Sequence, residues 1–262
     1  MVTSYHVHTT FSDGQNSVQE MIEAAISLGI DEIGISDHYV LTTGQIFDWS
    51  MKLDAIADYF GAIGLAADKF RTKIKVRYGI EADFVPETAQ QLGEILQEYQ
   101  FDYVIGSVHL IDGVCIDSSK DYWDALDQSG KNDVIRAYWA MIAKLAKSGL
   151  YDIVGHLDLY KKFGSQPTID ISADVMTALD AIAEAGIAIE LNTSGWHKPI
   201  HEQYPSAAVL RGCQKRGIPV ILTADAHRTD DITCDFDRGR LLLRTIGYTN
   251  TALFQNRKMT ID

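Results

Sequence analysis

The sequence predicts an α/β fold, a (β/α)7 or TIM-like barrel that forms a single domain over residues 1–262. Strand-like and helix-like segments alternate along the whole chain, which favours parallel strands because each helix must carry the chain back. Strands such as DIVGHL and PVILTA are almost wholly apolar, as expected where both faces of a sheet are covered. No linker rich in proline, glycine or serine divides the chain, and its length is ordinary for one α/β barrel.

Seven apolar runs are predicted as strands, and loop-like sequence follows each of them. They cover residues 3–8, 32–37, 75–83, 102–109, 152–157, 187–193 and 219–225. Between them lie segments with apolar residues at helical spacing, which we predict as helices over residues 17–29, 49–70, 86–99, 132–149, 171–186, 206–217 and about 235–247.

Several helix ends carry recognisable signals. Ser17 is placed to cap the first helix, with Glu20 completing a capping box. Pro86 suits a first helical turn, and Gly149 suits the residue after a helix. A short segment, TALFQ, is expected after the last helix.

The composition limits the classes of function. An apolar fraction of 46% supports a large core, and the absence of a long apolar run argues against a membrane span. The net charge of −13 disfavours long nucleic acids as partners. The start of the chain, MVTSYHVHTT, lacks the pattern of a signal peptide, and the three cysteines have no CxxC spacing. We therefore expect free thiols and a cytoplasmic protein, with an oligomeric state that the sequence leaves open.

Six of the eight histidines lie at the ends of these apolar runs, together with two carboxylates. The residues are His6, His8, His38, His109, His156, His227, Glu81 and Asp225. In parallel barrels the functional site forms at the carboxyl ends of the strands, so these side chains should meet at one face. Imidazoles and carboxylates gathered in this way predict a site for several metal ions.

Local spacing supports this prediction. His6 and His8 are two residues apart on a strand and should therefore project to one face, as should Asp225 and His227. Asp13 precedes Gly14, so by itself it is an ordinary turn aspartate.

Two further aspartates stand beside the predicted ligands. Asp37 should face away from His38, where it would support a ligand or cap the backbone. Asp83 would either support a ligand or belong to a loop.

Other catalytic patterns are missing. No P-loop or Rossmann glycine pattern follows the first strand, and no GxSxG elbow is present. Cys115 has no evident base to activate it. His197 and His201 have the spacing of a zinc pair, but Pro199 between them argues against a helix there.

The segments HVHTTFSDG, SDH, GIEADF, GSVH, GHLD, ELNTSG and TADAH, in this order, resemble the polymerase-and-histidinol-phosphatase (PHP) superfamily. The resemblance implies a distorted (β/α)7 barrel with three divalent ions, which in this family are zinc, iron or manganese. It implies a first metal held by His6, His8, Glu81 and Asp225, a second by Glu81, His109 and His156, and a third by Asp13, His38 and His227.

GSVH, GHLDLYKKF and ELNTSG look most like the histidinol-phosphate phosphatase branch. The resemblance implies hydrolysis of a small phosphate monoester, L-histidinol phosphate, by a hydroxide that bridges two metals, with Glu81, Asp225 and His227 as the catalytic residues. Lys161, His197 and Arg228 are the expected phosphate contacts, His197 standing where the branch usually has arginine. One alternative is a PHP phosphoesterase for nucleoside phosphates or oligonucleotide ends, and another is a metal-stabilised scaffold without activity.

Overall fold

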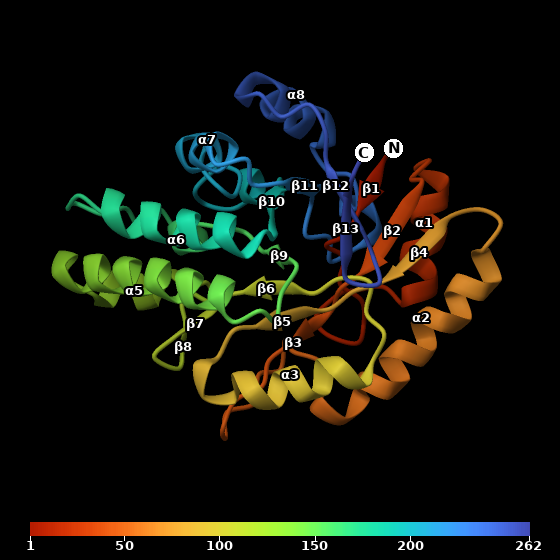
Figure 1. Ribbon diagram of the computed structural model, residues 1–262. Coiled ribbons are helices and arrows are strands. Elements are labelled where there is room, and N and C mark those ends of the chain that lie inside the picture. Colours follow the sequence, from red (N-terminus) through yellow and green to blue (C-terminus); the bar gives the residue numbers. More distant parts are fainter.

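The computed structural model describes residues 1–262, with parallel strands at the centre and helices around them (Figure 1). The strands are β1 (Thr3–Ser4), β2 (Glu32–Ile35), β3 (His38–Tyr39), β4 (Lys75–Tyr78), β5 (Glu81–Asp83), β6 (Ile105–Ser107), β7 (Leu110–Ile111), β8 (Val114–Cys115), β9 (Ile153–Val154), β10 (Ala188–Asn192), β11 (Val220–Thr223), β12 (Ala252–Gln255) and β13 (Lys258–Ile261). The helices are α1 (Val18–Ser27), α2 (Ile56–Phe70), α3 (Ala89–Glu98), α4 (Lys120–Ala125), α5 (Gln128–Lys147), α6 (Ser172–Ala185), α7 (Ala207–Lys215) and α8 (Phe236–Ile246).

The parallel strands form two sheets, which together make up the wall of the barrel. One has the order β1-β2-β4 and the other β11-β10-β9-β6-β5-β3. β2 leads into β3, and β4 leads into β5, so each of these predicted strands spans both sheets. A single parallel bridge between Val7 and Ala226 connects β1 with the chain after β11, and the amide of His8 donates to the Ala226 carbonyl at 2.8 Å. The seven predicted strand regions thus follow one another around a distorted (β/α)7 barrel, which confirms the predicted fold class.

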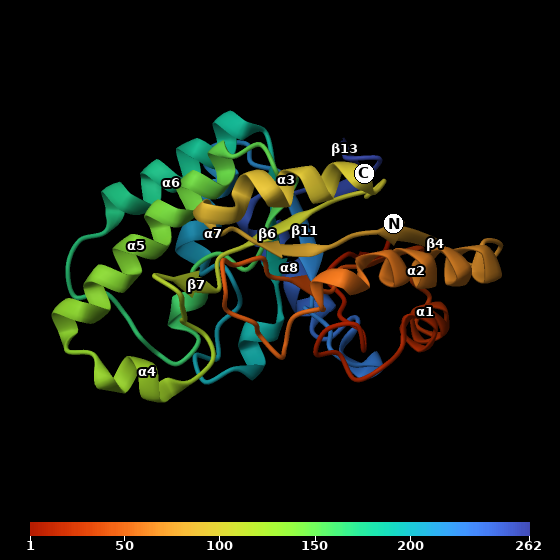
Figure 2. The ribbon, with the colours of Figure 1, turned by 90° about the horizontal axis from the view of Figure 1, so that it is seen from below.

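The helices pack on the outside of the barrel. α5 lies beside α6, and α1 lies beside α2, as Figures 1 and 2 both show. The Ser17–Glu20 capping box at the start of α1 is present as predicted. No helix has the length and apolar character needed to cross a membrane.

One predicted helix starts later than its periodicity suggests. Residues 49–70 were expected as one helix, but α2 begins only at Ile56. The amide of Met51 instead donates to the carbonyl of His38 at 2.9 Å, and the Trp49 ring lies 5.0 Å from the His38 ring. Tertiary contacts at the barrel mouth therefore override the local helical preference of this segment.

The sequence did not predict the small elements before α5, and it predicted the tail segment TALFQ without its pairing. A hairpin of β7 and β8 and the short helix α4 lie between β6 and α5. The tail segment TALFQ forms β12, which pairs antiparallel with β13. Phe254 of this tail hairpin packs with Tyr5 and Tyr103 in a separate apolar cluster, and Arg257 binds the Asp152 carboxylate.

The tail hairpin thereby covers the amino ends of the strands. Asp102 and Asp152, which bind its turn, stand just before β6 and β9. The two chain termini also meet on this side, where the Met1 amino group lies 2.8 Å from the Asp262 carboxylate (Figure 1). The carboxyl ends of the strands, on the opposite side, remain available for a site.

Candidate metal centre

The predicted histidines and carboxylates converge at the carboxyl ends of the strands. Glu81, the first residue of β5, has no solvent exposure and lies at the middle of the group. Its Oε2 atom lies 3.3 Å from His6 Nε2 and 2.6 Å from His38 Nδ1, whereas its Oε1 atom lies 3.0 Å from His156 Nε2 and 3.9 Å from His109 Nε2. The two oxygens therefore face two different sets of imidazoles, which is the arrangement of a bridging carboxylate.

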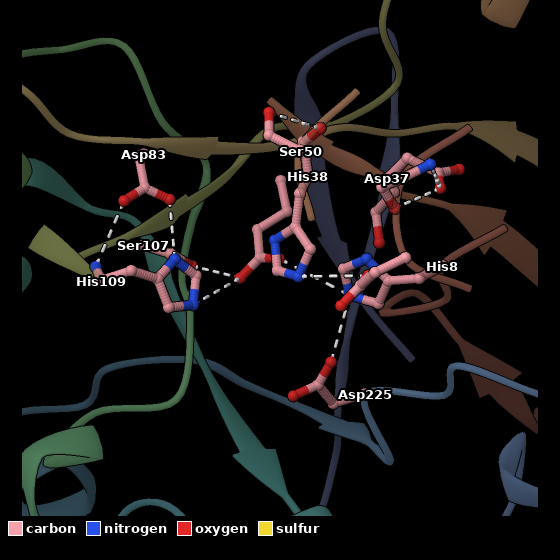
Figure 3. Close-up of polar contacts among 12 residues, drawn as sticks. His8, Asp37, His38, Ser50, Asp83, Ser107, His109 and Asp225 are labelled. Atoms are coloured by element: carbon pink, nitrogen blue, oxygen red, sulfur yellow. Dashed lines mark hydrogen bonds and ion pairs between the residues drawn. The ribbon is translucent and has the colours of Figure 1, made fainter. Parts of the chain in front are cut away.

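One imidazole nitrogen each from His6 and His8 and one carboxylate oxygen each from Glu81 and Asp225 form a compact donor set. His6 Nε2 and His8 Nε2 each approach Glu81 Oε2 and Asp225 Oδ1, at separations from 3.1 to 3.6 Å. Ligand atoms about 2.0 Å from a tetrahedral zinc ion are about 3.3 Å apart, so the spacing fits such an ion. Figure 3 shows His8 and Asp225 joined in this way, with His38 beside His8.

Outside this set, the donor atoms face only two further imidazole nitrogens, His38 Nδ1 at 2.6 Å from Glu81 Oε2 and His227 Nδ1 at 3.7 Å from Asp225 Oδ1. His6 Nε2, His8 Nε2, Glu81 Oε2 and Asp225 Oδ1 are buried and make no hydrogen bond. A buried polar atom without a partner is costly and rare in folded proteins. Because all four atoms are metal-ligand types aimed at one another, a divalent cation would satisfy them together, and the residues present fit such an ion.

Asp13, His38 and His227 gather at the more exposed edge of the centre. Asp13 Oδ1 lies 3.2 Å from His227 Nε2 and 3.7 Å from His38 Nε2. Together with His8, these residues could hold a further ion. The rings of His38 and His227 each lie 4.2 Å from the His8 ring.

The imidazoles of the centre differ in their protonation. Burial opposes the charge of His6, His109 and His227, but nearby carboxylates outweigh it and raise the pKa values of these rings, so a bound cation would have to displace protons from them, whereas His8 differs. Burial, together with the neighbouring His38 and His227, lowers the pKa of His8 to about 3, so its ring is neutral near pH 7, the form that binds a metal. Burial opposes the charge of Glu81, but His38 and His6 outweigh it and hold the pKa of this carboxyl well below its usual range. The centre therefore combines ionised carboxylates with imidazole nitrogens that face them.

Hydrogen bonds behind the ligands fix their orientation. Asp83 accepts from His109 Nδ1 at 2.7 Å (Figure 3). This contact leaves His109 Nε2 facing Glu81. Asp37 accepts from the backbone and hydroxyl groups of Thr9 and Ser12 and so holds the loop that leads to Asp13, as its predicted backbone-capping role requires.

Sequence reasoning missed Glu190, which has no solvent exposure. Its carboxylate accepts from His6 Nδ1 at 2.8 Å and from the His156 amide at 2.6 Å. A carboxylate inside the apolar strand β10, two residues before Asn192, was the available signal.

A cavity of about 400 Å³ opens beside the centre. Its walls are formed by Asp13, His38, Trp49, His109, Cys115, Asp117, Ser118, His156, Leu159, Lys162, Ser194, Lys198, Tyr204, Asp225 and His227. Two lysines thus line it, while the net charge of the whole chain is −13. The same walls carry Asp13, Asp117 and Asp225, so cations held by the donor cluster would be needed for the cavity to favour a small anionic molecule.

The cavity walls also include Cys115. Burial and the Asp117 carboxylate raise the pKa of the Cys115 thiol to about 12, so it stays protonated near pH 7. The thiol is therefore not an activated nucleophile, in line with the sequence prediction.

The three basic residues expected to contact phosphate do not line this cavity. Lys161 is buried. Its ammonium group donates to Glu202 at 2.6 Å and to the Gln203 carbonyl at 2.9 Å, and it forms an ion pair with Asp158 at 3.1 Å.

The other two basic residues have partners elsewhere. His197 Nε2 lies 2.6 Å from Asp235, and the exposed Arg228 pairs with Asp231 at 3.0 Å. Lys162 and Lys198, the residues that follow Lys161 and His197, line the cavity instead. Each pair lies at the end of a short helical turn, after β9 or β10, where successive side chains point in different directions.

Comparison with known proteins agrees with this architecture. The family model described as "PHP domain" matches residues 4–194. A probable histidinol-phosphatase of Deinococcus radiodurans is 33% identical over 255 residues, which are 97% of this chain and 96% of that protein. The histidinol-phosphatase of Bacillus subtilis is 25% identical over 87% of this chain and 94% of that protein.

A solved structure has the same fold. The crystal structure of histidinol phosphate phosphatase from Lactococcus lactis, complexed with zinc, L-histidinol and phosphate, superposes with a TM-score of 0.84. It is 24% identical in sequence and covers 99% of this chain and 98% of its own. With a family model matched over residues 4–194 and a relative 33% identical along nearly its whole length, this chain belongs to the PHP domain family.

Proposed function

We propose that this protein hydrolyses L-histidinol phosphate to L-histidinol and phosphate, as a metal-dependent phosphoric monoester hydrolase formed by residues 1–262 as one domain. The observation that carries the proposal is the Glu81 carboxylate, whose two oxygens face different imidazoles. Imidazole and carboxylate atoms without hydrogen bonds surround it, and a cavity of about 400 Å³ lies beside it. Relatives named histidinol-phosphatase that align along most of this chain support the choice of substrate.

In this proposal nine side chains hold three divalent ions of zinc, iron or manganese. The first ion takes His6, His8, Glu81 and Asp225; the second shares Glu81 and adds His109 and His156; the third takes Asp13, His38 and His227. When bound, such ions activate water as a nucleophile and neutralise charge on a phosphoryl group. The mixed nitrogen and oxygen donors are compatible with all three metals.

The protein's own residues would orient the substrate. Its phosphate group would enter the cavity at the wall formed by Asp225 and His227 and would be attracted by the ammonium group of Lys198, for which the structure shows no ion pair. Lys162 is already held by Asp117 at 2.9 Å, so it would lend positive potential rather than a direct contact. The leaving alcohol would lie toward Trp49 and Tyr204.

Steady-state phosphate release tests the proposal. The metal content of the same sample is measured, and L-histidinol phosphate is compared with a panel of nucleoside monophosphates, phosphorylated oligonucleotide ends and other small monoesters. We expect the highest kcat/KM for L-histidinol phosphate. A higher value for a nucleotide would contradict the substrate assignment, and no phosphate release from any substrate by metal-loaded protein would contradict the enzymatic role.

A further inference from the structure

A second group of metal-ligand side chains lies away from the Glu81 centre. It consists of His197, at the end of the helical turn after β10, and of Cys234 and Asp235, which immediately precede α8. None of the three lines the cavity, and they form a group separate from the donors around Glu81. His197 is exposed and the other two are half-buried, so an ion from solution can reach all three.

One nitrogen of His197 lies against both partners. Nε2 is 2.6 Å from Asp235 Oδ2 and 3.4 Å from Cys234 Sγ, and the sulfur is 4.0 Å from the same carboxylate oxygen. In a Cys-His-Asp catalytic relay the carboxylate and the thiol would bind different ring nitrogens. Three donors that meet at one point match a coordination site instead.

We propose that His197, Cys234 and Asp235 bind one zinc-like divalent cation, separate from the ions of the Glu81 centre and completed by water. Ligand atoms around a tetrahedral zinc ion lie about 3.3 Å apart for nitrogen and oxygen, and about 3.5 Å apart when one is sulfur. The observed separations of 2.6, 3.4 and 4.0 Å differ from these values by well under 1 Å. Small rotations of the exposed His197 side chain and of the half-buried Cys234 and Asp235 side chains would close that difference.

The side chain of Asp235 is directed to this point rather than to its own helix. Asp235 occupies the N-cap position of α8, where an aspartate commonly accepts hydrogen bonds from the first turn, yet its carboxylate makes no such bond. The carboxylate faces His197 Nε2 instead. The left-handed backbone of Asp235, with φ of 56°, accompanies this orientation.

The backbones that carry the donors are held in place. The Thr193 hydroxyl donates to the carbonyl of Cys234 at 2.7 Å, which ties the end of β10 to the start of α8. The guanidinium of Arg238 stacks on the Trp196 ring at 3.9 Å and makes a second connection between the same segments. The donors therefore meet because the fold positions their backbones, and binding an ion requires little ordering.

The donor set selects a class of cation. A thiolate, an imidazole and a carboxylate favour zinc and similar borderline ions over magnesium or calcium, which prefer oxygen alone. Burial, Asp235 and Asp231 raise the pKa of the Cys234 thiol, so it carries its proton until the cation displaces it. The two positive charges of the ion are then balanced by one negative charge on the thiolate and one on the carboxylate.

Occupation of this site would affect the nearby cavity wall. His197 belongs to the same turn as Ser194, and Lys198 is the next residue; both Ser194 and Lys198 line the cavity. A cation that joins this turn to α8 would hold both residues in position. The site is thus a structural clamp at the rim of the barrel, chemically distinct from the thiolate-free centre around Glu81.

Cobalt titration of the full chain tests the proposal, because only a cysteine ligand gives a thiolate-to-cobalt charge-transfer band. The titration is done without oxygen and with a non-thiol reductant. We expect the native protein to show this band, C234S to lose it together with one equivalent of bound cobalt, and H197A to bind that equivalent at least about 100-fold more weakly. C115S is the matched control, since Cys115 lines the cavity, and it should keep the band.

Two results would overturn the proposal. One is the absence of a thiolate band in native protein at saturating cobalt, which would make the three side chains a surface ion pair with a bystander thiol. The other is a band that persists in C234S. Neither result depends on turnover, so this test is independent of the proposed phosphatase activity.

Discussion

The Nδ1 atom of His6 lies 2.8 Å from the carboxylate of Glu190, and both side chains are completely buried. This contact turns the other ring nitrogen, Nε2, toward Glu81 and Asp225. Glu190 also accepts from the Thr223 hydroxyl at 2.8 Å, which fixes the carboxylate itself. Glu190 is therefore a positioning residue that acts through His6.

Glu190→Gln is expected to weaken metal binding without unfolding the protein. A neutral amide supports the imidazole less well than a carboxylate, and losses of about 10–100-fold in metal affinity are typical for such partners. Competition with a chelating dye measures the affinity. Glu184→Gln, the same change at an exposed position of α6, is the control. Equal affinities in the two variants would show that Glu190 does not tune the site.

Glu81→Ala is expected to be among the most damaging single changes to activity. The two oxygens of this carboxylate face separate groups of imidazoles, so in the proposed arrangement its loss would remove a ligand from two ions and leave their repulsion less compensated. Metal content and turnover should fall together, whereas Glu94→Ala, at an exposed position of α3, should change neither. Full metal stoichiometry with near-native turnover would refute the bridging assignment.

Removal of the metal ions is expected to lower thermal stability as well as activity. In the proposed arrangement the ions would bind the folded donor set and not the unfolded chain, so at about 100 times the Kd each occupied site would add about 2.7 kcal/mol. Chelation should therefore lower the Tm by about 5 °C or more, and restored metal should reverse the change. Calorimetry with and without chelator measures this, and an unchanged Tm would contradict a shared, buried metal centre.

Lys161→Met is expected to destabilise the fold rather than weaken substrate binding. The change leaves the buried Asp158 carboxylate without its cation, and breaking a buried pair in this way costs about 3–5 kcal/mol. Urea denaturation should show the loss, and the double variant with Asp158→Asn should recover part of it. A large rise in KM with unchanged stability would instead restore Lys161 as a phosphate contact.

Lys198→Met is expected to raise the KM for L-histidinol phosphate by about 10-fold with a smaller effect on kcat, because an outer charge contact binds ground state and transition state alike. Lys215→Met, at an exposed position of α7, controls for the loss of one positive charge. Arg228→Ala should behave like this control, since Arg228 pairs with Asp231 on the surface. Equal KM values in all three variants would exclude Lys198 as a contact.

The pattern of apolar runs alone determined the barrel and most of the donor cluster. His6 and His8 share a face because side chains alternate along a strand, and parallel strands bring His38, Glu81 and His156 to one edge. Those rules depend only on local periodicity and topology.

Side-chain direction outside the strands was decided by the tertiary structure. Lys161 and Lys162 are neighbours in the sequence, yet one is buried among acceptors and the other lines the cavity. Their placement depends on turn geometry and on distant partners such as Glu202. The sequence carried no local signal for either contact.

The sequence by itself determined the fold class through its apolar runs and the family through its motifs, and it predicted which histidines and carboxylates gather at the strand ends. Only the tertiary structure decided which groups stand behind those donors, such as Glu190 and Asp83, and that the tail hairpin closes the opposite end of the barrel. The physical reason is that strand periodicity is encoded locally, whereas a hydrogen bond across 184 residues, as between His6 and Glu190, exists only once the chain has folded.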